Sequence, residues 1–270
     1  MGEKPQKIRI DIALHQQGLA PSREKSRAMI MAGEVLVDGR IVDKPGMKID
    51  STATLEVKAR PRFVSRGGDK LAGALDAFQL DITGRICADV GASTGGFTDC
   101  LLQAGAAKVY AIDVGYGQLD YTLRQDSRVI VMDRTNARHV TALPESVDLL
   151  VVDASFISLK LLLPVFKGWL TAQADLIALI KPQFEAGRKD VGKGGVVRDH
   201  AIHSRVLTEI LSFASGQDFA VRGLILSPLT GPAGNIEFLV WLGFGFNPVG
   251  VESLLAIDTL VEQAMNHAVT

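Results

Sequence analysis

An apolar segment that runs directly into a glycine-rich turn places the strongest constraint on how this chain can fold. Residues 86–90 form a short apolar run, and residues 91–97, Gly-Ala-Ser-Thr-Gly-Gly-Phe, follow it without a break. A second apolar run, 109–112, ends at Asp113. In a parallel α/β sheet, such glycines let a ligand approach the backbone, and an acid after the next strand accepts hydrogen bonds from ribose hydroxyls. The pattern predicts a nucleoside-binding pocket.

Two other structures are compatible with the same turn. The segment 91–95 matches the G-x-S-x-G elbow of hydrolases, but that fold needs several strands before the elbow and a late histidine. Here the run at 86–90 is the first expected strand of its sheet, and His200 and His203 precede the last two strands. A plain tight turn between strand and helix is the other alternative. The third glycine of the dinucleotide fingerprint is missing, so a cofactor with a ribose and no phosphate, such as S-adenosylmethionine, fits better.

Strand and helix patterns alternate through the larger part of the chain. The expected strands are 86–90, 108–112, 128–132, 147–152, 175–180, 219–226 and 236–242. This alternation predicts an α/β fold with a doubly wound, mostly parallel sheet. The last two strands are separated only by a Pro- and Gly-containing stretch, which suits a hairpin and an antiparallel final strand. An antiparallel final strand is typical of class I, Rossmann-like methyltransferases.

The first sixty residues read as a separate, basic α+β unit. Ser22 is expected to cap a helix over 23–32, and an Asp-Gly turn inside 35–42 favours a tight hairpin. Residues 1–62 hold 12 Lys and Arg against 8 Asp and Glu, a net charge of +4, whereas the remainder carries −5. A basic unit on an acidic body suggests a polyanionic partner, and a merely solvated basic face is the alternative.

This unit resembles the S4 RNA-binding domain. The matching residues are 9–11 (Arg-Ile-Asp), 18–23, Ala28 and 33–39. The resemblance implies binding to structured RNA through a helical face and the adjoining loop. The basic residues that we expect to contribute are Arg9, Arg23, Lys25, Arg27, Arg40 and Lys44.

The expected organisation is an S4-like domain at 1–58, a linker at 59–64, a second domain at 65–246 and a C-terminal helical extension at 247–270. The two cysteines, Cys87 and Cys100, have neither metal-site nor redox spacing. No secretory signal and no run of 18 apolar residues is present. We therefore expect a cytoplasmic protein without a metal and without stable membrane association. Its oligomeric state is not predicted.

Four ionisable residues occupy the places where parallel sheets bind ligands. Asp153 ends the apolar run 147–152, Lys181 ends the next strand, Glu237 lies in an otherwise apolar strand, and Lys70 lies in the first turn of a helix expected over 65–78. A charge in such a place is costly unless it is paired. Two structural salt bridges are one explanation, and a reactive centre is the other.

The second domain resembles the RrmJ/FtsJ-like ribose 2′-O-methyltransferases, whose catalytic tetrad Lys-Asp-Lys-Glu falls on these four residues in chain order. The whole chain resembles the TlyA family of rRNA 2′-O-methyltransferases, also known as the hemolysin A family. The segments that carry this resemblance are 65–71, 89–97, 113–115, 153–159, 181–185, 194–199 and 227–237. The linker departs from the family pattern, because Arg62 follows Pro61 there.

The resemblance implies S-adenosylmethionine as cofactor and cytidine in large-subunit rRNA as target, with small-subunit rRNA as a further target. The expected cofactor residues are Asp89, Gly91, Ala92, Ser93, Thr94, Gly95, Gly96, Phe97, Asp113, Val114 and Asp133. Asp133 has a helix-capping role as its alternative, and Lys181 is expected either to accept the proton or to orient the hydroxyl. Phe97 and Phe156 are candidates for stacking on a base or for the core. Further RNA contacts are expected from Arg66, Lys189, Lys193 and Arg198.

Two other functions remain open from the sequence. One is a membrane-damaging hemolysin, against which the lack of a spanning segment argues. The other is an RNA-binding ribosome-assembly factor without catalysis, against which the complete set of four ionisable residues argues.

Overall fold

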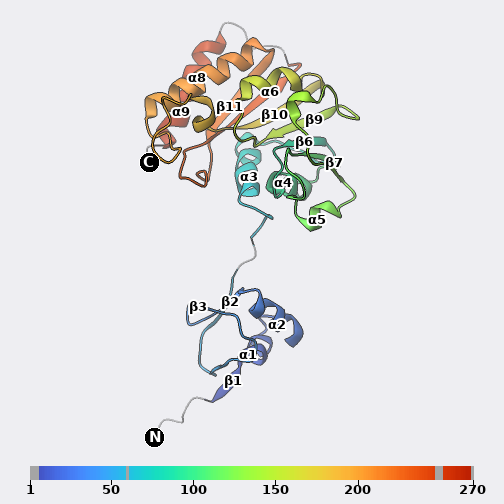
Figure 1. The fold of residues 1–270 in the computed structure, drawn as a ribbon, viewed down its shortest axis with the longest axis vertical. Helices are drawn as coiled ribbons and strands as arrows, with labels where there is room; N and C mark the ends of the chain where they lie inside the picture. Colours follow the sequence, from blue (N-terminus) through green and yellow to red (C-terminus); the bar gives the residue numbers. More distant parts are fainter. Residues whose placement is uncertain (1–5, 59–60, 247–251, 269–270) are drawn as a thin grey trace. The chain divides into compact units, whose positions relative to one another are not determined.

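The chain forms two compact units, residues 1–61 and 62–270, in the computed structural model. The structure describes residues 6–58, 61–246 and 252–268 (Figure 1). Parts of the expected linker and of the expected C-terminal extension, 59–60, 247–251 and 269–270, therefore lie outside the described residues. The division between the units falls inside the expected linker at 59–64.

The N-terminal unit packs two helices against short strands. The helices are α1 (Ile10–Gln16) and α2 (Arg23–Met31), and the strands are β1 (Lys7–Arg9), β2 (Val35–Val37), β3 (Arg40–Val42), β4 (Lys48–Asp50) and β5 (Leu55–Val57). Ser22 Oγ accepts a hydrogen bond of 3.1 Å from the Lys25 amide, as expected of the cap of α2. Asp38 and Gly39 have φ values of 49° and 76°, which is the backbone of a type I′ hairpin turn. The antiparallel pair β1–β4 was not predicted.

The larger unit is built on a seven-stranded sheet in the order β11-β12-β10-β9-β6-β7-β8. The strands are β6 (Ile86–Val90), β7 (Lys108–Ile112), β8 (Val129–Met132), β9 (Val147–Val152), β10 (Leu170–Ile180), β11 (Phe219–Leu226) and β12 (Phe238–Phe244). β12 lies antiparallel to both of its neighbours, whereas β6 to β10 are parallel. The mostly parallel sheet with an antiparallel final strand is confirmed.

Helices cover both faces of this sheet (Figure 1). One core contains side chains of α6 (Leu159–Phe166), α8 (His200–Gly216) and α9 (Glu252–Ala268). The other contains side chains of α3 (Gly67–Phe78), α4 (Gly96–Gln103) and α5 (Tyr121–Arg124). Successive strand residues alternate between these cores, as with Cys87 and Ala88, which follows from the two-residue period of a strand.

Two strands of the large sheet differ from the prediction by two residues or more. β10 begins at Leu170, five residues earlier than expected, and its pairing with β9 shifts register between Leu170 and Asp175. The irregular part before Asp175 lacks a continuous apolar pattern, so only the part from residue 175 onward was predicted as a strand. β12 covers Phe238–Phe244 instead of 236–242, because its pairing with β10 and β11 starts at Phe238 and continues to Phe244.

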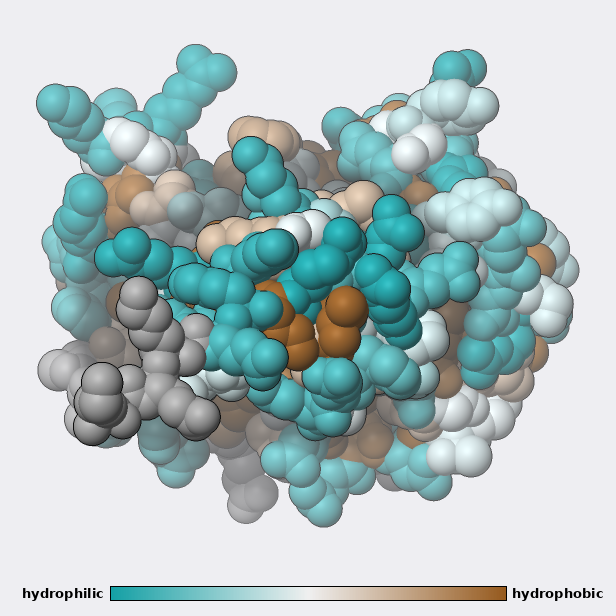
Figure 2. All heavy atoms as spheres, turned by 90° about the horizontal axis from the view of Figure 1, so that it is seen from below, coloured by the Kyte–Doolittle hydropathy of each residue, from teal (hydrophilic) through white to brown (hydrophobic). Residues whose placement is uncertain are grey.

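Large apolar side chains are exposed at several places, among them Met31, Val114 and Phe156. Figure 2 shows a face on which hydrophilic residues dominate around a small hydrophobic area. Among the described residues, no helix has both the length and the apolar character needed to cross a bilayer.

A buried carboxylate organises the N-terminal unit. Asp11 is fully buried, and its two oxygens accept hydrogen bonds from Arg9 Nε at 2.9 Å and Arg23 Nε at 3.0 Å. A third bond, from Arg9 Nη2, measures 3.0 Å. The hydrogen bond from Arg9 is the main reason that the pKa of Asp11 falls to about 2. Asp11 therefore joins the strand before α1 to the first turn of α2.

We expect Asp11→Asn to lower the free energy of unfolding of the N-terminal unit by about 2 kcal/mol at neutral pH. A carboxyl with a lowered pKa stabilises the folded state above its ordinary pKa, so the difference should vanish as the pH falls from about 4 toward 2. Hydrogen exchange of the α1 and α2 amides in the full chain, corrected for intrinsic exchange at each pH, measures this difference in stability. Asp50→Asn, which breaks the exposed pair with Lys7, is the control and should have a smaller effect. Equal protection in Asp11→Asn and the parent would contradict the expectation.

A second buried carboxylate lies in the sheet itself. Asp89 in β6 is fully buried, and its Oδ2 accepts a hydrogen bond of 2.7 Å from Thr98 Oγ1 of α4. Its other oxygen has no hydrogen-bond partner. Burial raises the pKa of Asp89 to about 7, and the hydrogen bond from Thr98 opposes that rise only in part.

This raised pKa predicts a pH dependence opposite to that of Asp11. Between about pH 4 and pH 7 the folded chain keeps a proton that the unfolded chain has lost, so the stability contributed by Asp89 decreases as the pH rises. We expect Asp89→Asn to remove this dependence and to raise stability at mildly alkaline pH by on the order of 2–4 kcal/mol. Urea unfolding followed by tryptophan fluorescence measures it, because both tryptophans lie in this unit. The exposed Asp81→Asn variant should keep the parental slope, and the same slope in Asp89→Asn would refute the assignment.

Candidate active site

The candidate site lies where the parallel strands of the larger unit end. Because parallel strands share one carboxyl edge, residues that follow different strands meet there. Gly91 follows β6, Asp113 follows β7, Asp153 follows β9 and Lys181 follows β10. The fold therefore brings together residues that are up to ninety positions apart in the sequence.

A cavity of about 620 Å³ opens at this edge. That volume is in the range of small-molecule sites. Of the expected cofactor residues, Gly91, Ser93, Asp113 and Val114 line it. Asp113 accepts hydrogen bonds from the Ser93 amide at 2.8 Å and from the Gly115 amide at 2.7 Å, so one carboxylate fixes both turns of the cavity wall. A carboxylate has further lone pairs with which it can accept bonds from ribose hydroxyls.

Two glycines in the turn after β6 leave no room for a side chain. At Gly91, with φ of 85°, an added Cβ would lie 2.6 Å from the carbonyl oxygen of Asp153. At Gly95, with φ of 97°, an added Cβ would collide with the side chains of Leu119 and Leu123. Both positions therefore require glycine for conformation and for space. The tight turn thus leaves Gly91 and Ser93 at the wall of this cavity.

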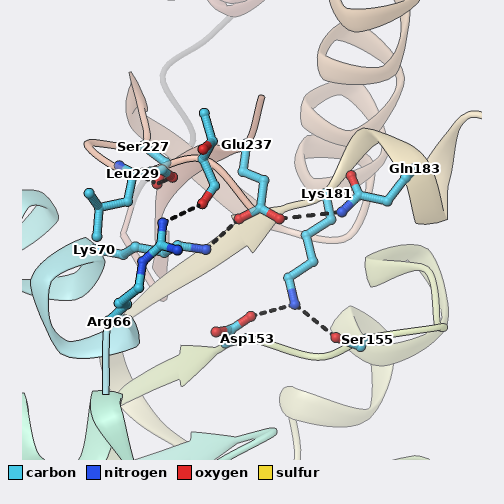
Figure 3. A network of polar contacts seen from close by, with 10 residues as sticks. Arg66, Lys70, Asp153, Ser155, Lys181, Gln183, Ser227, Leu229 and Glu237 are labelled. Carbon is cyan, nitrogen blue, oxygen red and sulfur yellow. Dashed lines mark hydrogen bonds and ion pairs between the residues drawn. The ribbon is translucent and has the colours of Figure 1, made fainter. Parts of the chain in front are cut away.

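A second cavity, of about 510 Å³, contains the four ionisable residues (Figure 3). Lys70 Nζ lies 2.5 Å from Glu237 Oε2, and both side chains are at least nine-tenths buried. Lys181 Nζ lies 2.5 Å from Asp153 Oδ1. The structure thus brings all four together as two ion pairs. Each buried charge lies next to a charge of opposite sign, which offsets part of the cost of desolvation.

Two residues that the sequence analysis did not single out complete this network. Ser155 Oγ accepts a hydrogen bond of 2.9 Å from Lys181 Nζ, and Gln183 Nε2 donates one of 3.3 Å to Glu237 Oε1 (Figure 3). Ser155 is two positions after Asp153, and Gln183 is two positions after Lys181, in the short helix α7 (Pro182–Glu185). That spacing was the available signal, but serine and glutamine are common at such places.

The two cavities share one wall. Gly91, Ser93, Asp153 and Ser155 line both. A ligand in the first cavity and a ligand in the second would therefore come closest beside the Asp153–Lys181 pair. This arrangement is suited to a transfer between two bound molecules.

The electrostatic state of Asp153 follows from its position. Burial raises the pKa of Asp153 above its ordinary value, and the neighbouring Lys181 ammonium opposes that rise. Lys70 also opposes it, whereas Glu237 adds to it. Asp153 is therefore a stronger proton acceptor than an exposed carboxylate would be.

The remaining expected cofactor residues take several places. Ala92, Thr94, Gly96 and Phe97 line the second cavity, and Phe97 is only 3% exposed because it also packs in the core. Asp89 lies beneath the turn and lines neither described cavity. Gly95 also lines neither of them, and acts through the backbone turn described above.

Asp133 does not line the cavity, and it caps no helix either. Its Oδ2 accepts hydrogen bonds from Arg124 Nη2 at 2.6 Å and from the Gly117 amide at 3.3 Å. The bond from Arg124 is the main cause of its lowered pKa. Thr135, Asn136, Ala137 and Arg138, which follow Asp133, are the residues of this segment that line the cavity.

One aromatic residue at the site has an unusual backbone conformation. Phe156 is 90% exposed, has a φ of 63° and packs against Phe184 with 4.9 Å between ring centroids. A left-handed backbone at a bulky residue is strained, and such strain is typical of functional sites. Of the two aromatic candidates, Phe156 is thus the exposed one, and it lines the first cavity.

The expected RNA-binding residues lie on the surface of both units. In the N-terminal unit Arg23, Lys25, Arg27, Arg40 and Lys44 are exposed, and Arg9 is half-buried. In the larger unit Arg66 is exposed at the second cavity, where its Nη2 donates a hydrogen bond of 3.1 Å to the Thr230 carbonyl. Lys189, Lys193 and Arg198 are exposed in the loop before α8. Within the described part of the chain, no group of three or more His, Cys, Asp or Glu side chains could hold a metal ion.

Comparisons with known proteins agree with this geometry. Residues 63–244 match the family model of the FtsJ-like methyltransferases, and residues 8–55 match that of the S4 domain. The Bacillus subtilis protein YqxC, provisionally named an rRNA methyltransferase, is 50% identical over 249 residues, covering 88% of each chain.

Two further relatives extend over nearly the same length. The 16S/23S rRNA (cytidine-2′-O)-methyltransferase TlyA of Mycobacterium tuberculosis is 46% identical over 240 residues, covering 87% of this chain and 90% of TlyA. A solved structure from Streptococcus thermophilus, provisionally described as a hemolysin, is 43% identical with a TM-score of 0.72, covering 98% of this chain and 97% of that one. The family model alone spans more than half of the chain. The protein therefore belongs to the FtsJ-like methyltransferase family, with an S4 domain preceding the methyltransferase domain.

Proposed function

We propose that this protein transfers a methyl group from S-adenosylmethionine to the ribose 2′-hydroxyl of a cytidine in ribosomal RNA, in the cytoplasm. The observation that carries the proposal is the pairing of Lys70 with Glu237 and of Lys181 with Asp153 at the wall shared by two cavities. The relative TlyA, which is named for this reaction, supports the choice of cytidine and of rRNA. The S4 domain supports an RNA substrate.

The first cavity is the proposed cofactor site. Asp113 would accept hydrogen bonds from the ribose, the backbone of 91–95 would contact the amino-acid end, and Val114 would pack on the adenine. When bound there, S-adenosylmethionine supplies an electrophilic methyl group on a sulfonium. The second cavity then receives the target ribose.

The tetrad has two tasks in this mechanism. A ribose hydroxyl is a poor nucleophile at neutral pH and has to lose its proton as its oxygen attacks. The Lys181 ammonium, fixed between Asp153 and Ser155, orients the hydroxyl oxygen and stabilises the negative charge that develops on it. The proton passes to Asp153, which accepts it more readily than an exposed carboxylate would because burial raises its pKa. Orientation is thus the first proposed role of Lys181.

The Lys70–Glu237 pair also lines the second cavity. Glu237 is held by Lys70 on one oxygen and by Gln183 on the other. Both carboxylate oxygens thus have a partner within the protein, so we assign Glu237 a positioning role. An added Cβ at Gly231 would lie 2.5 Å from Glu237 Oε1, and glycine there leaves room for the carboxylate.

Transfer of tritiated methyl from S-adenosylmethionine to purified bacterial ribosomal subunits, followed by nuclease mapping, tests the reaction directly. We expect label on a cytidine 2′-oxygen of large-subunit rRNA. Label on a base would contradict the ribose as target. No incorporation into either subunit or into naked rRNA, despite measured cofactor binding, would indicate an RNA-binding assembly role instead. Leakage of liposomes by the pure protein would be needed to support a hemolysin.

We expect Lys181→Ala to reduce the rate of methyl transfer by about 10²- to 10⁴-fold, because it removes the group that orients and stabilises the attacking oxygen. RNA affinity and cofactor affinity should remain near those of the parent. Lys160→Ala is a matched control, since Lys160 also forms an ion pair, 2.9 Å from Glu209, but lines neither cavity. Full activity in Lys181→Ala would exclude the lysine from the mechanism.

A further inference from the structure

The loop that precedes α8 carries four exposed cations. It comprises residues 186–199, between α7 (Pro182–Glu185) and α8, and it exposes Arg188, Lys189, Lys193 and Arg198. In the described part of the chain, no carboxylate forms an ion pair with any of these four. The two acids of the loop are already engaged, since Asp190 pairs with Arg205, and Asp199 caps α8 through the Ala201 amide.

The tip of this loop has little structure of its own. It contains Gly192, Gly194 and Gly195, and the last two have φ values of 79° and 75°. Its internal backbone hydrogen bonds include those from the Gly192 amide to the Val196 carbonyl, 3.1 Å, and from the Gly195 amide to the Gly192 carbonyl, 3.1 Å. Glycine loses more conformational freedom on ordering than any other residue. Contacts from outside the loop are therefore needed to hold its cations in place.

Asn235 supplies those contacts. Its side chain is only 3% exposed, its Oδ1 accepts a hydrogen bond of 3.0 Å from the Val197 amide, and its Nδ2 donates one of 3.0 Å to the Gly195 carbonyl. One side-chain amide thus binds the loop backbone on both sides of Val196. The Val197 carbonyl lies 3.2 Å from His203 Nε2 of α8, and the Val197 side chain is buried.

The same residue belongs to the wall of the second cavity. Asn235 precedes Glu237 by two positions, and its carbonyl accepts a hydrogen bond of 2.9 Å from the Gly231 amide. Thr230 and Pro232, in the same segment, line the second cavity together with Glu237. Asn235 therefore connects the basic loop to the segment that carries one member of the tetrad.

We propose that Asn235 is a positioning residue for the RNA substrate: it fixes the loop 186–199 so that its cations hold backbone phosphates next to the second cavity. This inference rests on the proposed function, because it requires an RNA substrate. Asn235 itself does not touch the RNA. Its effect is expressed through Lys193 and the other cations of the loop.

The test is a double-mutant cycle between Asn235→Ala and Lys193→Ala in the full-length protein. Binding to purified bacterial large ribosomal subunits is measured over a series of potassium chloride concentrations. The slope of log affinity against log salt reports the number of phosphate contacts, about 0.9 for each contact. Gln103→Ala is the matched control, because that amide also makes two hydrogen bonds, to the Arg62 carbonyl and to Asp99, but none to the loop.

We expect Lys193→Ala to lower the slope by about one in the parent and to leave it unchanged in the Asn235→Ala background. Asn235→Ala alone should lower the slope by about two and the affinity by about tenfold, as the loss of two phosphate contacts predicts. Its cofactor affinity should equal that of the parent. Gln103→Ala should leave the slope unchanged. If Asn235 contributed to fold stability alone, Asn235→Ala would change neither the slope nor the effect of Lys193→Ala on it.

Additive losses in the cycle, or an unchanged slope in Asn235→Ala, would overturn the inference. If Asn235→Ala fails to fold, Asn235→Leu goes through the same cycle and decides, since leucine has a similar volume, adds no charge and makes neither hydrogen bond to the loop. If the parent binds the subunits and the cycle is additive, the inference alone fails. If the parent binds no ribosomal RNA at any salt concentration, the proposed function fails and the inference fails with it.

Discussion

The pairing of buried charges at one edge of the sheet is the constraint on which the larger unit depends. Lys70 and Glu237 are 167 positions apart, and their 2.5 Å contact is possible only when α3 is packed at the end of β12. Removing one partner would leave the other charged, desolvated and alone, which costs far more than the pair contributes. Correct assembly of sheet and helix is therefore required before either charge can be accommodated.

Much of this architecture could be predicted because the local patterns were strong. The turn after β6, the carboxylate after β7 and the hairpin before β12 each have a chemical signature within a few residues. The four members of the tetrad were predicted from chain order and resemblance, and the structure shows them as two pairs. The pairing itself, Lys70 with Glu237 rather than with Asp153, depends on strand order and could not be derived from the sequence.

What the sequence did not reveal consists of contacts between distant segments. The β1–β4 pair joins residues about forty positions apart, and neither strand has a distinctive pattern. Asp133 illustrates the same limit, because its carboxylate faces Arg124 and the Gly117 amide instead of the cavity. A strand-end acid can turn toward ligand or toward a neighbouring loop, and only the packing decides between them. Asn235 was missed for the same reason, since both of its partners lie in another loop.

The buried Asp11 has a consequence for how the N-terminal unit meets a ligand. Its carboxylate holds the guanidinium groups of Arg9 and Arg23 in fixed orientations before anything binds. A long side chain that is ordered in advance loses little rotational freedom on association, so more of its interaction energy appears as affinity. The acidic residue thus lowers the entropic cost at which these two basic side chains would bind an anion.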